Sequence, residues 1–347
     1  MDNELRAIRF CRPGFIPMKY VVNSACWHHY DFLELCYFML ERPFLFPGFR
    51  SPSAPYQPVH GVNARCGQPF CDVWGCTWAT SEDGITGAVV GHPLADWVAF
   101  SSYRGPDPAQ TDGLEIIDWE KVRGRLVVQR QAGRMVQGTL PHGHTFLRLL
   151  YLRGYENLMY DFADGEPRIE RLVEMVEAFN RAVVERYLGA GAQMFGFPED
   201  LGMQRGPMLS PEHFARYIQP SYHRLMTLVH EHQALVHMHS DGDIRALAGM
   251  ILRSGVDIFN LQDHVNGLDW IRRELKGRVC IELDIDRQST SFTGTPAGID
   301  AMIREEVATL GSPEGGLMMI YGLYPGVPME NARAVADAMI RYAGYFN

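Results

Sequence analysis

The sequence predicts an α/β protein, a (β/α)8 barrel, and three observations support this fold class. From about residue 140 to the end, apolar strand-like segments alternate with helical segments, which is the pattern of parallel βαβ units. Five successive predicted strands end in ionisable or amide side chains, and a barrel brings all such strand ends to one mouth. A doubly wound sheet would gather fewer of them and would usually carry a glycine-rich phosphate loop, but neither GxGxxG nor GxxxxGK followed by Ser or Thr occurs.

The expected elements follow one another along this second part of the chain. Apolar residues at helical spacing predict helices over residues 144–163 and 166–191, the second ending at Gly189 or Gly191. A helix over 210–232 begins with Ser210 as its N-cap and Pro211 at its first position. Further helices are expected at 244–255, 268–277, 296–311 and 329–346, and strands within 192–202, 234–243, 256–262, 278–286 and 315–322.

The first 110 residues lack this regular pattern. They hold many of the prolines and most of the tryptophans, and FLFPGFRSPSAPYQPVHG cannot form a continuous helix. Asp83-Gly84 is a hairpin candidate between short strands. We therefore expect residues 1–110 to be an irregular extension packed on the barrel, and residues 111–347 to be the barrel, in one structural unit.

Composition excludes several classes of protein. The net charge of −9 and the pI near 5.8 leave no basic excess to neutralise nucleic-acid phosphates. No apolar run is long enough for a transmembrane helix, and the charged N-terminus lacks the apolar core of a signal peptide. The odd number of cysteines indicates free thiols, and the spacing of Cys66, Cys71 and Cys76 fits no zinc-finger pattern. We expect a cytoplasmic protein with neither a nucleic-acid nor a membrane partner.

The segment VHMHSDGD, residues 236–243, is the strongest local signal for a functional site. Successive side chains of a strand point to opposite faces, so His237, His239 and Asp241 are expected to share one face. Two imidazoles and a carboxylate on one face indicate a metal site or an acid/base site, while a polar strand end with hydrogen-bonded histidines is the simpler alternative. His237 lies deeper in the strand and is equally suited to supporting a ligand residue.

Other strand ends add further candidates. In IELDID three carboxylates alternate, and they would repel one another unless they are protonated, hydrogen-bonded or metal-bound. FPEDLG places two acidic residues directly after a strand, where one is suited to acid/base chemistry. The candidate catalytic residues are Glu199, Asp200, His239, Asp241 and Tyr321; the candidate substrate-binding residues are Arg205, Gln262, His264, Asp284 and Asp286; the candidate metal ligands are His237, His239, Asp241 and Glu282.

Several of these segments together resemble a known family. FPEDLGMQRGPMLSPEHFARYIQP, HMHSDGDI, GVDIFNLQ, FTGTPAGI and GVPMENARAVADAM occur in this order and are similar to the uroporphyrinogen decarboxylase superfamily. The resemblance covers roughly residues 140–345. It implies a (β/α)8 barrel and a place among haem-pathway decarboxylases, methyl-corrinoid:coenzyme M methyltransferases and related demethylases.

The two branches of the superfamily imply different site residues. The decarboxylases carry an RQAGR segment near the N-terminus, whose cations hold the substrate carboxylates; here RQAGR lies at Arg130–Arg134, far downstream. The methyltransferases bind zinc through His-x-Cys and a distal cysteine. The histidine matches His239, but Asp241 stands in place of the first cysteine and Tyr321 in place of the second.

The resemblance therefore favours methyl transfer to or from, or demethylation of, a small methylated or methoxylated substrate, with a corrinoid on a partner protein as a candidate acceptor and zinc as a candidate cofactor. The alternative is uroporphyrinogen III decarboxylation in porphyrin biosynthesis, which needs no cofactor. A third alternative is a non-catalytic ligand-binding barrel, although buried carboxylates without a function are costly to retain. A homodimer is a further expectation.

Overall fold

The computed structural model describes residues 2–53 and 56–346. The chain divides into two compact units. Unit 1 consists of Met1–Gly67, Thr80–Gly87 and Asn260–Asn347, and unit 2 consists of Gln68–Ala79 and Ala88–Phe259. Each unit thus combines segments that are far apart in the sequence, and the domain boundary expected at residue 110 coincides with none of these limits.

Unit 2 is built on three parallel strands in the order β5-β6-β9. They are β5 (Gln137–Thr139), β6 (Met194–Pro198) and β9 (Leu235–Ser240). In β9 the residues alternate between half-buried and fully buried, so His237 and His239 share one face, as predicted. Because parallel strands end at the same edge, the residues that follow β5, β6 and β9 come together.

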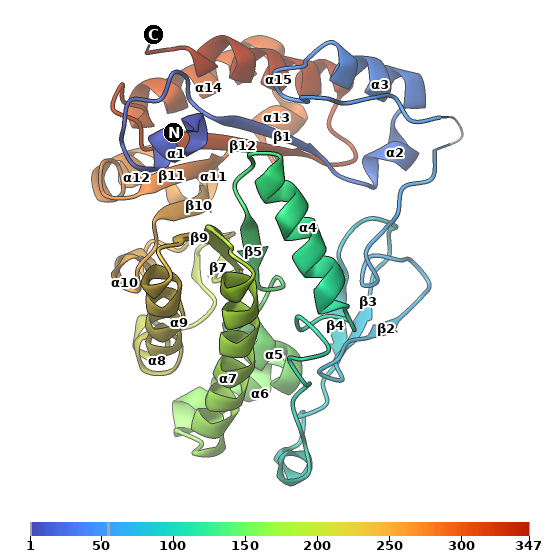
Figure 1. The fold of residues 1–347 in the computed structure, drawn as a ribbon, viewed down its shortest axis with the longest axis vertical. Coiled ribbons are helices and arrows are strands. Elements are labelled where there is room, and N and C mark those ends of the chain that lie inside the picture. Colours follow the sequence, from blue (N-terminus) through green and yellow to red (C-terminus); the bar gives the residue numbers. More distant parts are fainter. Residues whose placement is uncertain (1, 54–55, 347) are drawn as a thin grey trace. The chain divides into compact units, whose positions relative to one another are not determined.

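The remaining elements of unit 2 include a small antiparallel sheet of order β2-β3-β4 and an antiparallel pair, β7 and β8. In Figure 1, helix α7 is the long helix that packs on β5 and α9. The elements are β2 (Phe70–Cys71), β3 (Thr77–Ala79), β4 (Ala88–Gly91), the 3-10 helix η1 (Trp97–Ser101), α4 (Trp119–Gln131), α5 (Phe146–Arg153), α6 (Tyr155–Asp164), α7 (Arg168–Gly189), β7 (Gly202–Met203), β8 (Gly206–Pro207), α8 (Pro211–His213), the π-helical segment η2 (Phe214–Ile218), α9 (Gln219–Glu231) and α10 (Ala248–Arg253).

Unit 1 also contains parallel strands, in the order β1-β12-β11. They are β1 (Met18–Val22), β12 (Leu317–Leu323) and β11 (Cys280–Asp284), while β10 (Ile258–Gln262) spans the limit between the units. Helices α14 and α15 lie side by side (Figure 1). The helices are α1 (Asn3–Ile8), α2 (Cys26–His29), α3 (Phe32–Leu40), α11 (Asp263–Asn266), α12 (Leu268–Glu274), α13 (Thr290–Thr293), α14 (Pro296–Leu310) and α15 (Met329–Ala343).

The α/β class and the alternation of strands and helices are as predicted, and the differences have local causes. The expected helix 144–163 is two helices, because Gly154 adopts a φ of 80° between α5 and α6. Ser210 is the predicted N-cap: its hydroxyl accepts the amide N–H of His213 at 3.1 Å. Helix α4 was not anticipated, whereas β1 lies where the family resemblance places an entry strand, near Ile16-Pro17, and joins the parallel sheet of unit 1.

None of the helices in residues 2–53 and 56–346 combines the length and the hydropathy that crossing a bilayer requires.

Candidate functional site

Four ionisable side chains of unit 2 gather where its parallel strands end. His142 follows β5, Asp200 follows β6, His239 is the penultimate residue of β9, and Asp241 comes directly after that strand. The strand register explains the gathering, because Pro198 of β6 is paired with His239 of β9. We call His142, Asp200 and His239 the strand-end triad.

One carboxylate oxygen lies at the centre of the strand-end triad. Asp200 Oδ1 is 3.2 Å from His142 Nε2 and 3.5 Å from His239 Nε2. The backbone N–H of Asp241 donates to the same oxygen at 3.2 Å. His239 Nε2 is also 3.6 Å from Asp241 Oδ1. The site is therefore a compact set of two imidazoles and two carboxylates, suited to proton transfer or to binding a cation.

The electrostatics of the triad keep Asp200 ionised. Burial by itself raises the pKa of Asp200, but the hydrogen bonds and charges of His142 and His239 outweigh it, so the pKa lies well below its ordinary range. The triad still reaches solvent, since the exposed fraction is 44% for the His142 side chain and 21% for that of His239. Both rings are therefore in contact with solvent.

The ligand atoms of the triad lie within 4.8 Å of one another, which suits a single metal ion. Within residues 2–53 and 56–346, this is the one group of three or more His, Cys, Asp or Glu residues with that property. Of the four ligands expected from the sequence, it contains His239 and lacks His237, Asp241 and Glu282. Glu282 is a buried residue of β11 in unit 1.

Glu199, an expected catalytic residue, instead holds the start of helix α5 in place. Its side chain is fully buried, and its Oε1 accepts the backbone N–H groups of Thr145 and Leu147 at 2.9 and 2.8 Å. Its other oxygen accepts the hydroxyl of Tyr222. Glu199 thus caps the first turn of α5 and holds the loop that carries His142.

The same loop is held from a second direction. Gly143 adopts a φ of 75° and donates its N–H to the carbonyl of Pro198 at 2.9 Å. Asn180 of α7 donates to the carbonyl of His144 at 2.8 Å. Because β6 and α7 both hold this loop, the position of His142 relative to Asp200 is set by the packing of unit 2.

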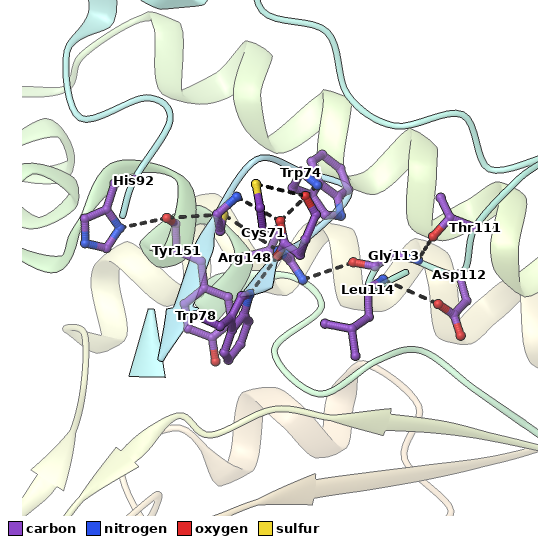
Figure 2. A network of polar contacts seen from close by, with 12 residues as sticks. Cys71, Trp74, Trp78, His92, Thr111, Asp112, Gly113, Leu114, Arg148 and Tyr151 are labelled. Atoms are coloured by element: carbon purple, nitrogen blue, oxygen red, sulfur yellow. Dashed lines mark hydrogen bonds and ion pairs between the residues drawn. The ribbon is translucent and has the colours of Figure 1, made fainter. Parts of the chain in front are cut away.

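Figure 2 shows a buried polar network that anchors helix α5. Arg148 Nη1 is 2.7 Å from Asp72 Oδ2, and both side chains are almost fully buried. Trp78 donates its indole N–H to the same oxygen at 3.0 Å, and Arg148 also donates to the carbonyl of Gly113 at 3.4 Å. The segment before β3 is thereby fastened to the helix that Glu199 caps.

Four of the five expected substrate-binding residues lie around one cavity of unit 1. Gln262, His264, Asp284 and Asp286 line it together with Arg287, next to the ends of β10 and β11. Arg287 Nη2 is 2.5 Å from Asp284 Oδ2. Burial raises the pKa of Asp286, but hydrogen bonds from Ser289 and from backbone N–H groups outweigh it and leave the pKa lowered.

The fifth expected residue, Arg205, is exposed on the β7–β8 hairpin of unit 2. Tyr321, an expected catalytic residue, is fully buried in β12 with its ring centroid 5.1 Å from that of Tyr20. Burial raises the pKa of Tyr321 to about 12. This environment is typical of a packed phenol.

The RQAGR arginines lie away from the strand-end triad. Both Arg130 and Arg134 are exposed, and Arg130 Nη2 donates to the carbonyl of Gly191 at 2.6 Å. Gly191 precedes β6, whereas Asp200 follows it. Arg130 is therefore at the opposite end of the strand, about 16 Å away for five residues at about 3.3 Å each.

Sequence reasoning missed His142. The strand before it, β5, has three residues with the sequence QGT, which carries no hydrophobic alternation. The PHGH segment, residues 141–144, contains two histidines around a glycine, and this was the signal that the sequence offered. In the structure that glycine has a positive φ.

The strands and this site define an α/β protein whose ionisable groups follow adjacent parallel strands, the usual place of catalytic groups in α/β enzymes. The family model for uroporphyrinogen decarboxylase (URO-D) matches residues 143–342. The chain belongs to the uroporphyrinogen decarboxylase family, as its motifs indicated.

One solved structure supports the same fold class. A methyltransferase from Methanosarcina mazei is similar, with 14% sequence identity, 98% coverage of both chains and a TM-score of 0.62. A D-psicose 3-epimerase is more remote, with 6% identity, a TM-score of 0.39, and coverage of 66% of this chain and 85% of the epimerase. Among curated protein sequences, none matches this chain.

Proposed function

We propose that this protein is an enzyme that removes or transfers the methyl group of a small methylated or methoxylated compound, with a corrinoid on a partner protein as the acceptor. In this reaction the bond between the methyl carbon and the substrate heteroatom breaks, the heteroatom keeps the electron pair, and the reduced corrinoid cobalt supplies the pair that forms the new bond. The proposal includes a closed (β/α)8 barrel as the complete fold and a homodimer as the assembly.

The observation that carries the proposal is the strand-end triad in a chain of this family. Stabilising the heteroatom as it leaves requires a positive charge or a proton donor close to it. His142 and His239 supply imidazole groups held beside an ionised Asp200, and both rings reach solvent. Methyl transfer also agrees with the structural similarity to the methyltransferase from Methanosarcina mazei.

The alternative function, decarboxylation of uroporphyrinogen, receives less support from the site. That substrate carries several carboxylates, and arginine is the side chain best suited to hold them. Within the described part of unit 2, the RQAGR arginines lie at the amino end of β6, whereas the strand-end triad lies at its carboxyl end. We therefore expect no efficient turnover of uroporphyrinogen.

An assay with purified full-length protein tests the function. Reduced cobalamin serves as the methyl acceptor, and a panel of methoxylated aromatics, methylated amines and methylated thiols serves as donors, with methylation of cobalamin followed by its visible absorption. His239→Ala should abolish transfer, while His223→Ala, which changes an exposed histidine of α9, should leave it unchanged. Release of CO2 from uroporphyrinogen at an ordinary enzymatic rate, about 1–10³ per second, without methyl transfer would instead establish the decarboxylase.

A further inference from the structure

Two of the three ligand-to-ligand distances in the strand-end triad match the edges of a metal coordination shell, and all three are within 4.8 Å. Asp200 Oδ1 lies 3.2 and 3.5 Å from the two histidine Nε2 atoms. In a tetrahedral zinc site with bonds of about 2.0–2.1 Å, neighbouring ligand atoms are about 3.3 Å apart. From this match we infer that His142, Asp200 and His239 together bind one divalent transition-metal ion, with zinc as the first candidate.

The contacts of the triad are longer than the shortest charge-assisted hydrogen bonds and converge on one carboxylate oxygen. Charge-assisted bonds between an imidazolium and a carboxylate are about 2.7–2.9 Å long. Both contacts here are longer, and both converge on the single oxygen that already accepts the N–H of Asp241 at 3.2 Å. Two imidazole nitrogens directed at one carboxylate oxygen have the arrangement of ligands around an ion.

The surroundings of the triad also suit a metal site. The N–H of Asp241 orients the Asp200 carboxylate, which is the role that second-shell donors play at metal centres. Glu199, through its bonds to Thr145 and Leu147, holds the loop of His142. Three protein ligands with partly exposed side chains leave a coordination position open, as catalytic zinc sites do.

The ligand set also narrows the substrate class, and this step rests on the proposed function. Two neutral imidazoles and one carboxylate contribute a single negative charge, so a bound divalent ion keeps a net positive charge. Such an ion polarises an adjacent oxygen, and imidazole and carboxylate ligands are harder than thiolates. The site is thus matched to a methoxylated substrate, whose leaving atom is oxygen, rather than to a thiol.

Metal binding can be measured without any substrate. The full-length protein is freed of metal by chelation and titrated with Co²⁺, with visible absorption reporting binding and zinc added as a competitor. We expect one ion per chain. His142→Ala, Asp200→Asn and His239→Ala should each weaken binding at least about 100-fold, since loss of a second-shell partner alone costs about 10–100-fold.

Two control variants identify the ligands. His237→Ala changes a histidine on the same face of β9 that lies outside the triad, and His28→Ala disrupts the exposed contact of His28 with His60, whose Nε2 atoms are 3.1 Å apart. Both should bind Co²⁺ like the unaltered protein. Unchanged binding by His142→Ala, or loss of binding in His237→Ala, would overturn the ligand assignment.

The shift of the unfolding temperature on adding zinc tests the ligand assignment even if a variant is less stable than the unaltered protein. Because ligand binding to the native state raises the unfolding temperature, zinc should raise it for the unaltered protein and for both controls, but for none of the triad variants. The site and the function can also fail separately. Stoichiometric Co²⁺ binding without methyl transfer supports the site and contradicts the function, whereas methyl transfer by chelated protein does the reverse.

Discussion

Replacing Glu306 by glutamine should flatten the pH dependence of this protein's stability. Glu306 lies on α14 of unit 1, is 3% exposed, and interacts with the carboxyl group of Asp263, which is 8% exposed. Asp263 also accepts the backbone N–H groups of His264 and Asp286, at 2.5 and 3.1 Å. Two carboxyl groups in contact and out of water hold a proton between them.

The magnitude follows from proton linkage. Burial raises the pKa of Glu306 well above its usual value, and the neighbouring Asp263 carboxyl group raises it further. At a pH between the pKa of the unfolded chain, about 4.3, and the raised native pKa, the native state binds one more proton than the unfolded state. The free energy of unfolding therefore falls by about 1.4 kcal/mol for each pH unit as the pH rises through this window.

Glu306→Gln removes this contribution, because the amide donates an N–H to Asp263 at every pH. Within this window, the variant should gain about 1.4 kcal/mol relative to the unaltered protein for each pH unit, measured by urea unfolding at two pH values. Glu305→Gln, which changes the exposed neighbour on the same helix, is the matched control and should leave the slope unchanged. Parallel pH profiles for Glu306→Gln and the unaltered protein would refute the shared proton.

Two further substitutions test the supports of the site, and a third tests a helix cap. Arg148→Met should lower the free energy of unfolding by about 3–5 kcal/mol, because it leaves the Asp72 carboxylate buried without its cation; a loss below about 1 kcal/mol by chemical denaturation would contradict a buried ion pair. Glu199→Ala should cost about 1–3 kcal/mol or more, since the N–H groups of Thr145 and Leu147 at the start of α5 lose their acceptor. It should also weaken Co²⁺ binding by displacing His142. Stability and affinity both equal to those of the unaltered protein would show that Glu199 has no such role. Ser210→Ala should cost about 1 kcal/mol through loss of the N-cap, with Ser210→Thr as the control that keeps a hydroxyl, and equal melting temperatures for the two variants would count against the cap.

The parts of the fold that could be predicted are those with a strong local signal. Helix α7 was expected over 166–191 and spans Arg168–Gly189, because a long apolar stripe at helical spacing has no competing interpretation. Strand β9 was expected from its alternation, which also placed His237 and His239 on one face. Strand β5 was missed, because it has only three residues and no hydrophobic pattern of its own. It forms a strand because it pairs with β6.

The candidate site likewise contains residues that the sequence predicted and residues that only the structure revealed. The sequence alone indicated His239 and Asp200 as residues at the ends of strands, because parity and strand order can be read from periodicity. It did not reveal that His142 joins them, nor that Glu199 and Tyr321 are buried. Those facts depend on strand register and on packing against α5 and β1, which join residues far apart in the chain. Periodicity reports which face a side chain occupies, whereas the neighbours on that face are chosen by the tertiary contacts that bury the strands together.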